Sequence, residues 1–571
     1  MPLWLVSGAG IITSIQISPT DPRYLLNFEL QASGFPSFWR IMESLSSWQE
    51  RKRKLEGERD DLVRRLEVIE RDIIKAQAGY GAIYNKDAPV LTLPVEITCL
   101  IFRDAHSVME VERTDDQIRM HLTEVAISHV CRQWRSTAIG LPILWSSFYY
   151  HGPSANYATL SRFQIYIERS KLHTLELWLD FRQVIRDREF NVAILNTALT
   201  AVPRWRLVSI FFDGDSPQPT SWISTLIHLE LEALHAPHLE HLALHPNISF
   251  EAEEELASIN SIGPHIFTEG APTLKSVWLD TSAPSLYLPP LSGVTTLRFE
   301  HGKYPADLGF SLNTLRAILT LPNVENLSMF ETLCDDNIVM EGILLIPMER
   351  LRHLRLSDND TMLLLLKFLR APLLESIILQ HAWIPVGYGG RSTAQDAAIY
   401  SFPSLASITL FDVPCDSLNS LRHFMRITSA VRHVTIIHNE SDALDGALGQ
   451  GQMYAPPDQD PVWPHLETLT VDFEHRDTVV DHMLALFLTS HQRRDADLIL
   501  RVSDTRATTW KEVGHPQTTY ATIAELCTIE ELPERELRDP KPWPPGGDGV
   551  LGRRIDLEAD PFTIKSKFRS L

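Results

Sequence analysis

The chain has 571 residues, with 52 Lys and Arg against 73 Asp and Glu, so its formal net charge is −21. This acidic balance excludes general affinity for nucleic acid or acidic membranes, unless a local basic patch is present. Hydrophobic residues make up 44% and charged residues 22%, which is typical of a folded globular protein. The five Cys are scattered, and we expect neither disulfides nor a zinc module, no membrane-spanning helix, and a cytoplasmic or nuclear location.

Residues 1–45 carry no clear pattern, and their order stays open. Residues 46–84 predict a charged amphipathic helix, because nine basic and eight acidic side chains between Glu50 and Lys75 interleave with regularly spaced apolar ones. Leu55, Leu62 and Ile69 share one seam position of a heptad repeat, whereas Arg59 interrupts the other. Two interpretations remain open: a helix packed on its own chain, or a weak homodimer through a short coiled coil.

A seven-residue pattern, apolar-x-x-apolar-x-apolar-x, recurs eleven times between Leu172 and Leu466. From the copy at Leu239 to the copy at Leu466 there are eight steps over 227 residues, a mean of 28.4, as in leucine-rich repeats. Each copy predicts a short strand with alternate side chains buried, and a Pro often precedes it. The steps are uneven, so the repeats are irregular.

The periodicity predicts an α/β fold in which residues 160–530 form an irregular leucine-rich-repeat solenoid. Segments such as Ser311 to Leu321 and Thr361 to Leu369 have helical apolar spacing and would close the wall opposite the strands. Residues 531–571 are rich in Pro and Gly, and we expect a mobile tail.

Residues 88–150 predict a small helical domain. Pro94 can begin a helix whose apolar residues follow at helical spacing, and a second helix is expected from about Thr123 to Ala138. The polar stretch from Arg103 to Met120 is expected to loop out. The characteristic residues, in order, are Leu93-Pro94, Glu96-Ile97, Ile101-Phe102, Val130-Cys131, Trp134, Ala138, Leu141-Pro142 and Leu144-Trp145.

This ordered set resembles an F-box, in the form found in fungal F-box proteins, where a charged helix precedes the box and leucine-rich repeats follow it. The resemblance implies the substrate-recognition subunit of a Skp–cullin–F-box ubiquitin ligase, with a Skp-type adaptor and, through it, a cullin as partners. It assigns adaptor binding to Leu93, Pro94, Ile97, Ile101, Phe102, Val130, Cys131, Trp134, Leu144 and Trp145. The alternative is a protein-binding scaffold whose F-box-like segment only caps the solenoid.

Outward strand positions are the candidate substrate-binding residues, because large aromatic side chains and Arg often anchor protein interfaces. They are Trp178, Phe211, Trp278, Arg298, Phe330, Arg355, Phe411 and His433. We expect them to face solvent and capture a protein substrate. The alternative is that their rings pack on one another across adjacent strands and only stiffen the wall.

No nucleotide-binding, hydrolase or metalloprotease motif occurs, and we expect neither catalysis nor a cofactor. Four His residues, His235, His238, His241 and His245, could be read as metal ligands. The strand pattern instead places His241 and His245 on an exposed face, so we expect solvated side chains.

Overall fold

The structure is a computed structural model of the whole chain. It describes residues 36–84, 88–107, 111–114, 117–120, 122–151, 157–181, 188–211, 230–245, 263–280, 283, 287–300, 312–330, 346–357, 366, 369–381, 402–413, 424–425, 427–438, 463–473, 484–489, 498–512, 520–533, 536–537 and 543–545. The chain divides into two compact units, Met1–Ile97 and Thr98–Leu571.

The first unit is dominated by a single long helix, α2, from Pro36 to Tyr84. It contains the predicted charged helix and begins ten residues earlier than the predicted start at residue 46. A short 3₁₀ turn, η2 (Pro89–Thr92), follows it. The boundary between the two units lies within the next helix, α3 (Val95–Ser107).

The helical segment that opens the second unit differs from the prediction in two places. A two-stranded antiparallel hairpin, β1 (Val111–Thr114) and β2 (Gln117–Met120), lies in the polar stretch that was expected to loop out. The predicted helix over 123–138 is two helices, α4 (Thr123–Val130) and α5 (Arg132–Gly140), followed by the 3₁₀ turn η3 (Pro142–Trp145).

The break between α4 and α5 has a local cause. Cys131 is extended, with φ −155° and ψ 172°, and its Sγ accepts a hydrogen bond from the backbone N–H of Trp134 at 3.4 Å. A residue that caps the N-terminus of a helix leaves helical geometry itself, so Cys131 ends one helix and starts the next. The Arg135 side chain donates to the Ser128 carbonyl at 2.9 Å and fastens the two helices together.

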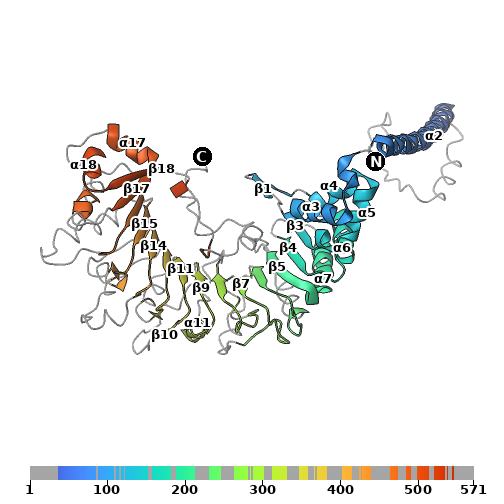
Figure 1. The fold of residues 1–571 in the computed structure, drawn as a ribbon. Helices are drawn as coiled ribbons and strands as arrows, with labels where there is room; N and C mark the ends of the chain where they lie inside the picture. Colours follow the sequence, from blue (N-terminus) through green and yellow to red (C-terminus); the bar gives the residue numbers. More distant parts are fainter. Residues whose placement is uncertain are drawn as a thin grey trace. The chain divides into compact units, whose positions relative to one another are not determined.

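The second unit is built on one 14-stranded sheet, in which every described pairing is parallel and neighbours follow in chain order (Figure 1). The strands are β3 (Ser147–His151), β4 (Leu175–Asp180), β5 (Trp205–Phe211), β6 (His241–His245), β7 (Ser276–Leu279), β8 (Thr296–Phe299), β9 (Asn326–Met329), β11 (His353–Ser357), β13 (Ser376–Gln380), β14 (Ser407–Phe411), β15 (His433–His438), β16 (Thr468–Phe473), β17 (Ile499–Ser503) and β18 (Thr528–Leu532).

The eleven copies of the pattern became eleven of these strands, from β4 to β16, so the predicted α/β repeat architecture is confirmed at the level of the sheet. Each copy buries its two alternating apolar residues, as Leu175 and Leu177 do in β4 and Leu242 and Leu244 do in β6. These side chains join one continuous hydrophobic core along the sheet. The arrangement is consistent with a leucine-rich-repeat-like solenoid.

Helical segments alternate with the strands. They are α6 (Tyr157–Arg169), α7 (Arg188–Leu199), the 3₁₀ turn η5 (Val202–Arg204), α11 (Leu312–Leu319), α17 (Asp504–Glu512) and α18 (Tyr520–Ala524). The helix predicted between Ser311 and Leu321 is therefore confirmed as α11, whose Leu315, Ile318 and Leu319 are buried. Most of the segment from Thr361 to Leu369 lies outside the described residues.

Two further short strands, β10 (Ile346–Pro347) and β12 (Leu369–Arg370), form a separate parallel pair. Of the helices that the structure describes, none is long and apolar enough to span a lipid bilayer.

Candidate functional site

The sheet has a second face, which we call the outer face, formed by the strand side chains that point away from the continuous core. Its central row crosses every strand in register, and the pairings place Trp178 beside Ser209, Ala243 beside Trp278, and Trp278 beside Arg298. The row in full is Tyr149, Trp178, Ser209, Ala243, Trp278, Arg298, Ser328, Arg355, Ile378, Thr409, Thr435, Thr470, Arg501 and Glu530.

The aromatic residues at the start of the outer face are buried, which corrects the expectation that they face solvent. Trp178, Phe211 and Trp278 are 3%, 1% and 1% exposed and form a small cluster of their own with Ala243. The ring centroids of Trp178 and Phe211, and those of Phe211 and Trp278, are 5.9 Å apart. The open alternative, rings packing on one another across the strands, is therefore the observed arrangement: Trp178 and Phe211 lie on adjacent strands, and Phe211 reaches Trp278 across β6.

Alternation of residue size makes room for these rings on the outer face. Ser209 and Ala243 occupy the row between Trp178 and Trp278. Small side chains beside large ones leave the space that an indole ring needs, so the rings spread over neighbouring strands instead of projecting into solvent.

His241 and His245 also lie on the outer face and are buried, so the expectation of solvated histidines is wrong. The His245 ring packs on Phe211 and Trp278, with centroids 5.1 and 4.8 Å apart. His241 Nδ1 lies 2.9 Å from Ser276 Oγ, and burial, aided by the nearby Arg298, lowers the pKa of His241 to about 3. Within the described ranges, no cluster of His, Cys, Asp and Glu side chains has metal-binding geometry.

A buried ionic cluster follows the aromatic one along the outer face. We call Arg298, Glu300, Ser328 and Arg355 the ionic cluster. Glu300 is fully buried and receives Arg298 Nη2 at 2.7 Å and Arg355 Nη2 at 2.6 Å. Ser328 also donates to Glu300, and Arg355 Nε donates to Ser328 Oγ at 2.6 Å. Arg298 and Arg355, predicted to be exposed, are 6% and 1% exposed.

The electrostatics of this cluster favour the ionised carboxylate. Burial by itself would raise the pKa of Glu300, but the two guanidinium groups, with the hydrogen bonds from Arg298 and Ser328, hold that pKa well below its ordinary value. Two guanidinium groups share this carboxylate, so the three ionised side chains carry a net positive charge. Trp278 lies against one of them, with Arg298 Cζ 4.2 Å from its ring centroid.

The C-terminal segment supplies a further aromatic ring to this cluster. Trp543 is buried, with its ring centroid 4.2 Å from Arg355 Cζ and 6.0 Å from Arg298 Cζ. This residue belongs to the segment 531–571, for which we expected a mobile tail, and the structure differs from that expectation at Trp543. Pro544 and Pro545 follow it and are half-buried and exposed.

The other predicted substrate-binding residues lie apart from these clusters. Phe330 and Phe411 are half-buried at the carboxyl ends of β9 and β14, and His433 is exposed at the start of β15. The structure therefore brings five of the eight predicted residues together on the strands β4 to β11, whereas the remaining three do not join them.

The predicted adaptor-binding residues divide by burial. Phe102, Leu144 and Trp145 are buried; Leu93, Cys131 and Trp134 are half-buried; and Pro94, Ile97, Ile101 and Val130 are exposed. Exposed apolar residues that were not predicted, Leu100 and Ile139, accompany them. Leu100 and Ile101 of α3 follow Ile97 by three and four positions, so these three exposed residues share one face of that helix.

The buried members of this set attach the helical segment to the sheet. Trp145 Nε1 donates to the Ala138 carbonyl at 2.8 Å, and its ring meets Tyr166 of α6 edge-on at 5.2 Å. Phe102 packs edge-on against Trp134 at 5.0 Å. Tyr166 also donates to the buried Glu124 of α4, whose pKa is raised by burial. Phe102, Leu144 and Trp145 thus belong to the core.

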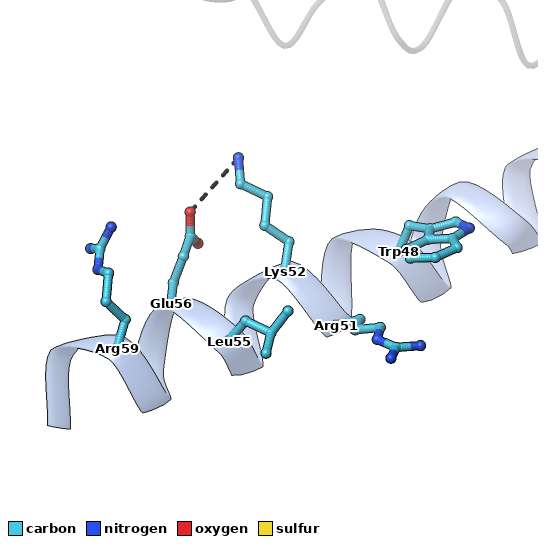
Figure 2. A pocket seen from close by; sticks show the side chains of 6 residues that line it. All are labelled: Trp48, Arg51, Lys52, Leu55, Glu56 and Arg59. Carbon is cyan, nitrogen blue, oxygen red and sulfur yellow. Dashed lines mark ion pairs between the residues drawn. The ribbon is translucent and has the colours of Figure 1, made fainter. Parts of the chain in front are cut away.

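Helix α2 carries its apolar residues on the surface. Leu55, Leu62, Leu66, Ile69 and Ile73 are each at least half exposed. Figure 2 shows a shallow pocket along this helix, together with the ion pair between Lys52 and Glu56 at 3.7 Å. Its lining residues are Trp48, Arg51, Lys52, Leu55, Glu56 and Arg59.

Sequence reasoning missed Glu300 and Trp543. Glu300 follows Arg298 by two positions directly after β8, and an acid two residues from an Arg on a strand points to the same face. The spacing of Arg298 and Glu300 could therefore have predicted that they lie side by side. Trp543 had only its isolation as a signal, since a large apolar residue is unusual within a Pro- and Gly-rich segment.

The chain matches no protein-family profile and no curated protein. Among solved structures it is similar to TLR13 in a complex with the single-stranded RNA ssRNA13, at 14% sequence identity and a TM-score of 0.28. That match covers 54% of this chain and 36% of the other chain, so the chain spans about a third of the length of the protein it matches. At this TM-score, neither a family nor a function follows from the likeness.

Proposed function

We propose that this chain is a protein-binding repeat scaffold that acts as the substrate receptor of a Skp–cullin–F-box ubiquitin ligase. In this proposal the helices α3, α4 and α5 bind a Skp-type adaptor and, through it, a cullin, and the sheet holds the protein to be ubiquitinated. The chemistry of ubiquitin transfer would belong to other subunits.

One observation carries the adaptor half of the proposal. Ile101 and Val130 are 43% and 58% exposed, although their neighbours Phe102 and Ile127 are buried. A small helical segment that buries one apolar face and exposes another has surface suited to a protein partner. The order of F-box-like residues along α3 to η3 gives that partner its proposed identity.

The adaptor half is tested with the full chain and a purified Skp-type adaptor. The double variant Ile101→Glu and Val130→Glu is expected to lower adaptor affinity at least about tenfold, since each charge would have to be desolvated in the interface. Leu373→Glu is the matched control, because Leu373 is 42% exposed and lies far along the chain, between β12 and β13. Undiminished binding by the double variant would remove the adaptor assignment and leave the scaffold whose helical segment only caps the sheet.

We also propose that α2 associates with a second copy of the chain as a short coiled coil. Leu55, Leu62 and Ile69, at heptad spacing, are 56%, 64% and 56% exposed, which leaves an apolar stripe for a partner helix. Sedimentation at tens of micromolar, roughly the range in which short coils associate, is expected to show a dimer that Leu62→Glu disrupts. A monomer throughout this range would contradict the proposal.

A further inference from the structure

Trp543 is an unusual buried residue because of its surroundings in sequence. It stands in the stretch Lys541-Pro542-Trp543-Pro544-Pro545, followed by two Gly, where no hydrophobic pattern predicts a strand or a helix. It is 7% exposed, yet it belongs neither to the continuous core nor to the aromatic cluster of the outer face. Its burial therefore comes from a contact made by this segment with the outer face.

The contact is made with charged groups. The ring of Trp543 lies over the guanidinium of Arg355 at 4.2 Å and within 6.0 Å of that of Arg298, while Trp278 lies on Arg298 at 4.2 Å. The two guanidinium groups are fixed by Glu300 and Ser328, so their orientation does not depend on Trp543. An aromatic face over a desolvated guanidinium is a favourable cation–π arrangement, and indole gives the strongest version of it.

At the ionic cluster, one polar atom of the Trp543 indole has no hydrogen-bond partner among the described residues. Among the described residues, no acceptor lies within hydrogen-bond distance of Trp543 Nε1, although that atom is buried. Other buried tryptophans of this protein show both situations: Trp145 and Trp205 donate to the carbonyls of Ala138 and Ala198, whereas Trp510 Nε1 also has no hydrogen-bond partner among the described residues. The ring face of Trp543 therefore makes a cation–π contact, whereas its N–H makes no hydrogen bond to a described residue.

We propose that the ionic cluster is a binding site for an aromatic side chain, preferably Trp, in a proline-flanked segment, and that Trp543 occupies this site within the chain as an internal ligand. A partner protein that carries such a segment competes with Trp543 and displaces it. This inference rests on the proposed role of the sheet as a protein-binding surface and names the chemistry that the surface recognises. Prolines on both sides restrict the unbound segment, which lowers the entropy lost on binding.

Because Trp543 is covalently linked to the chain that carries the site, it is expected to weaken the binding of an external peptide by a predictable factor. A segment tethered by a short chain acts at an effective concentration on the order of millimolar. If the free segment binds with a Kd of about 100 micromolar, the tether fills the site about ten to one, and an external peptide binds the intact chain about tenfold more weakly than a chain lacking Trp543.

The test uses full-length protein and a fluorescein-labelled peptide that corresponds to residues 539–547 of this chain. Fluorescence anisotropy is expected to show binding to the Trp543→Ala variant about tenfold tighter than to the wild type. A peptide with Trp replaced by Leu tests the aromatic requirement without any change to the protein, and it is expected to bind at least about tenfold more weakly.

Variants of the ionic cluster test whether the peptide binds there. In the Trp543→Ala background, Arg355→Lys keeps the charge but removes the planar guanidinium, and it is expected to weaken the peptide about tenfold. Arg352→Lys is the matched control, because Arg352 is an exposed residue three positions away that pairs with Glu375. Its affinity for the peptide is expected to stay unchanged.

Equal binding to wild type and Trp543→Ala, or equal binding of the Trp and Leu peptides, would overturn the inference. If Arg355→Lys does not fold, the Leu peptide still decides, because it leaves the protein intact. Adaptor binding through Ile101 and Val130 is measured on the same proteins. If the Trp543→Ala protein binds the adaptor but not the peptide, this inference alone is refuted. If it binds the peptide but not the adaptor, the adaptor assignment alone is refuted.

Discussion

The two halves of the outer face are built on the same strand geometry but have different surfaces. From β4 to β11 the central row holds Trp178, Trp278, Arg298 and Arg355, all buried. From β13 to β17 it holds Ile378, Thr409, Thr435, Thr470 and Arg501, of which only Thr470 is buried. One half is an aromatic and ionic layer that is itself packed, and the other is a row centred on three threonines, with most of its side chains half-buried.

This difference shows that the outward position of a strand residue does not decide its exposure. Large rings next to Ser209 and Ala243 cover one another, and Trp543 covers the two arginines. Threonines beside threonines lie next to one another across the strands but are too short to shield their neighbours from solvent. The first half therefore contributes to stability through burial, while the second half offers polar surface.

Trp278→Ala is expected to produce the largest effect. The change removes a ring that is 1% exposed and that packs on Phe211, His245 and Arg298, so a loss of about 3–5 kcal/mol in the free energy of unfolding is expected. Denaturant unfolding measures it. A loss below about 1 kcal/mol would mean that the aromatic cluster does not stabilise the first half.

Glu300→Gln comes next, with an expected loss of about 3 kcal/mol, because two buried guanidinium groups would lose their shared carboxylate. The matched control is Glu375→Gln, which breaks an exposed pair with Arg352 and is expected to cost less than about 1 kcal/mol. Similar losses for the two variants would contradict the distinction between the buried ionic cluster and an exposed ion pair.

The Glu300 effect has a defined pH dependence. Because the folded-state pKa of Glu300 lies below its ordinary value, its stabilising contribution is present above about pH 4.3, the usual pKa of Glu, and is lost as the pH falls further. The stability difference between wild type and Glu300→Gln is therefore expected to shrink below about pH 4. A difference that grows on acidification would show the opposite sign of shift.

The buried His241 provides a second pH-dependent test of the outer face. Burial lowers the pKa of His241 to about 3, so unfolding takes up a proton between that value and about 6.5, the usual pKa of His. Stability is expected to fall on acidification through this window by up to about 1.4 kcal/mol per pH unit, and His241→Gln is expected to flatten that dependence.

Thr435→Val is expected to have the smallest effect. Thr435 is half-buried between Thr409 and Thr470 in the central row, and valine keeps its shape and its strand propensity. A change within about 0.5 kcal/mol is expected from chemical denaturation. A loss comparable to that of Trp278→Ala would show that the second half is packed as tightly as the first.

The sequence by itself determined where the strands of the repeats lie and which residues of each strand face the core. The two-residue alternation and the eleven-fold pattern are local features, since neighbouring residues of a strand point to opposite faces whatever the rest of the chain does. Leu177, Leu242 and Leu354 are buried for this reason, and the same reasoning located helix α11.

Only the tertiary structure decided what happens on the outer face. Glu300 meets Arg355 across 55 positions in the chain, and Trp543 reaches the same cluster from the C-terminal segment. No local period encodes these contacts, because they depend on the order of strands in the sheet and on the return of a distant segment. The break at Cys131 is a similar case on a smaller scale, since a cap formed by one sulfur atom outweighed helical apolar spacing.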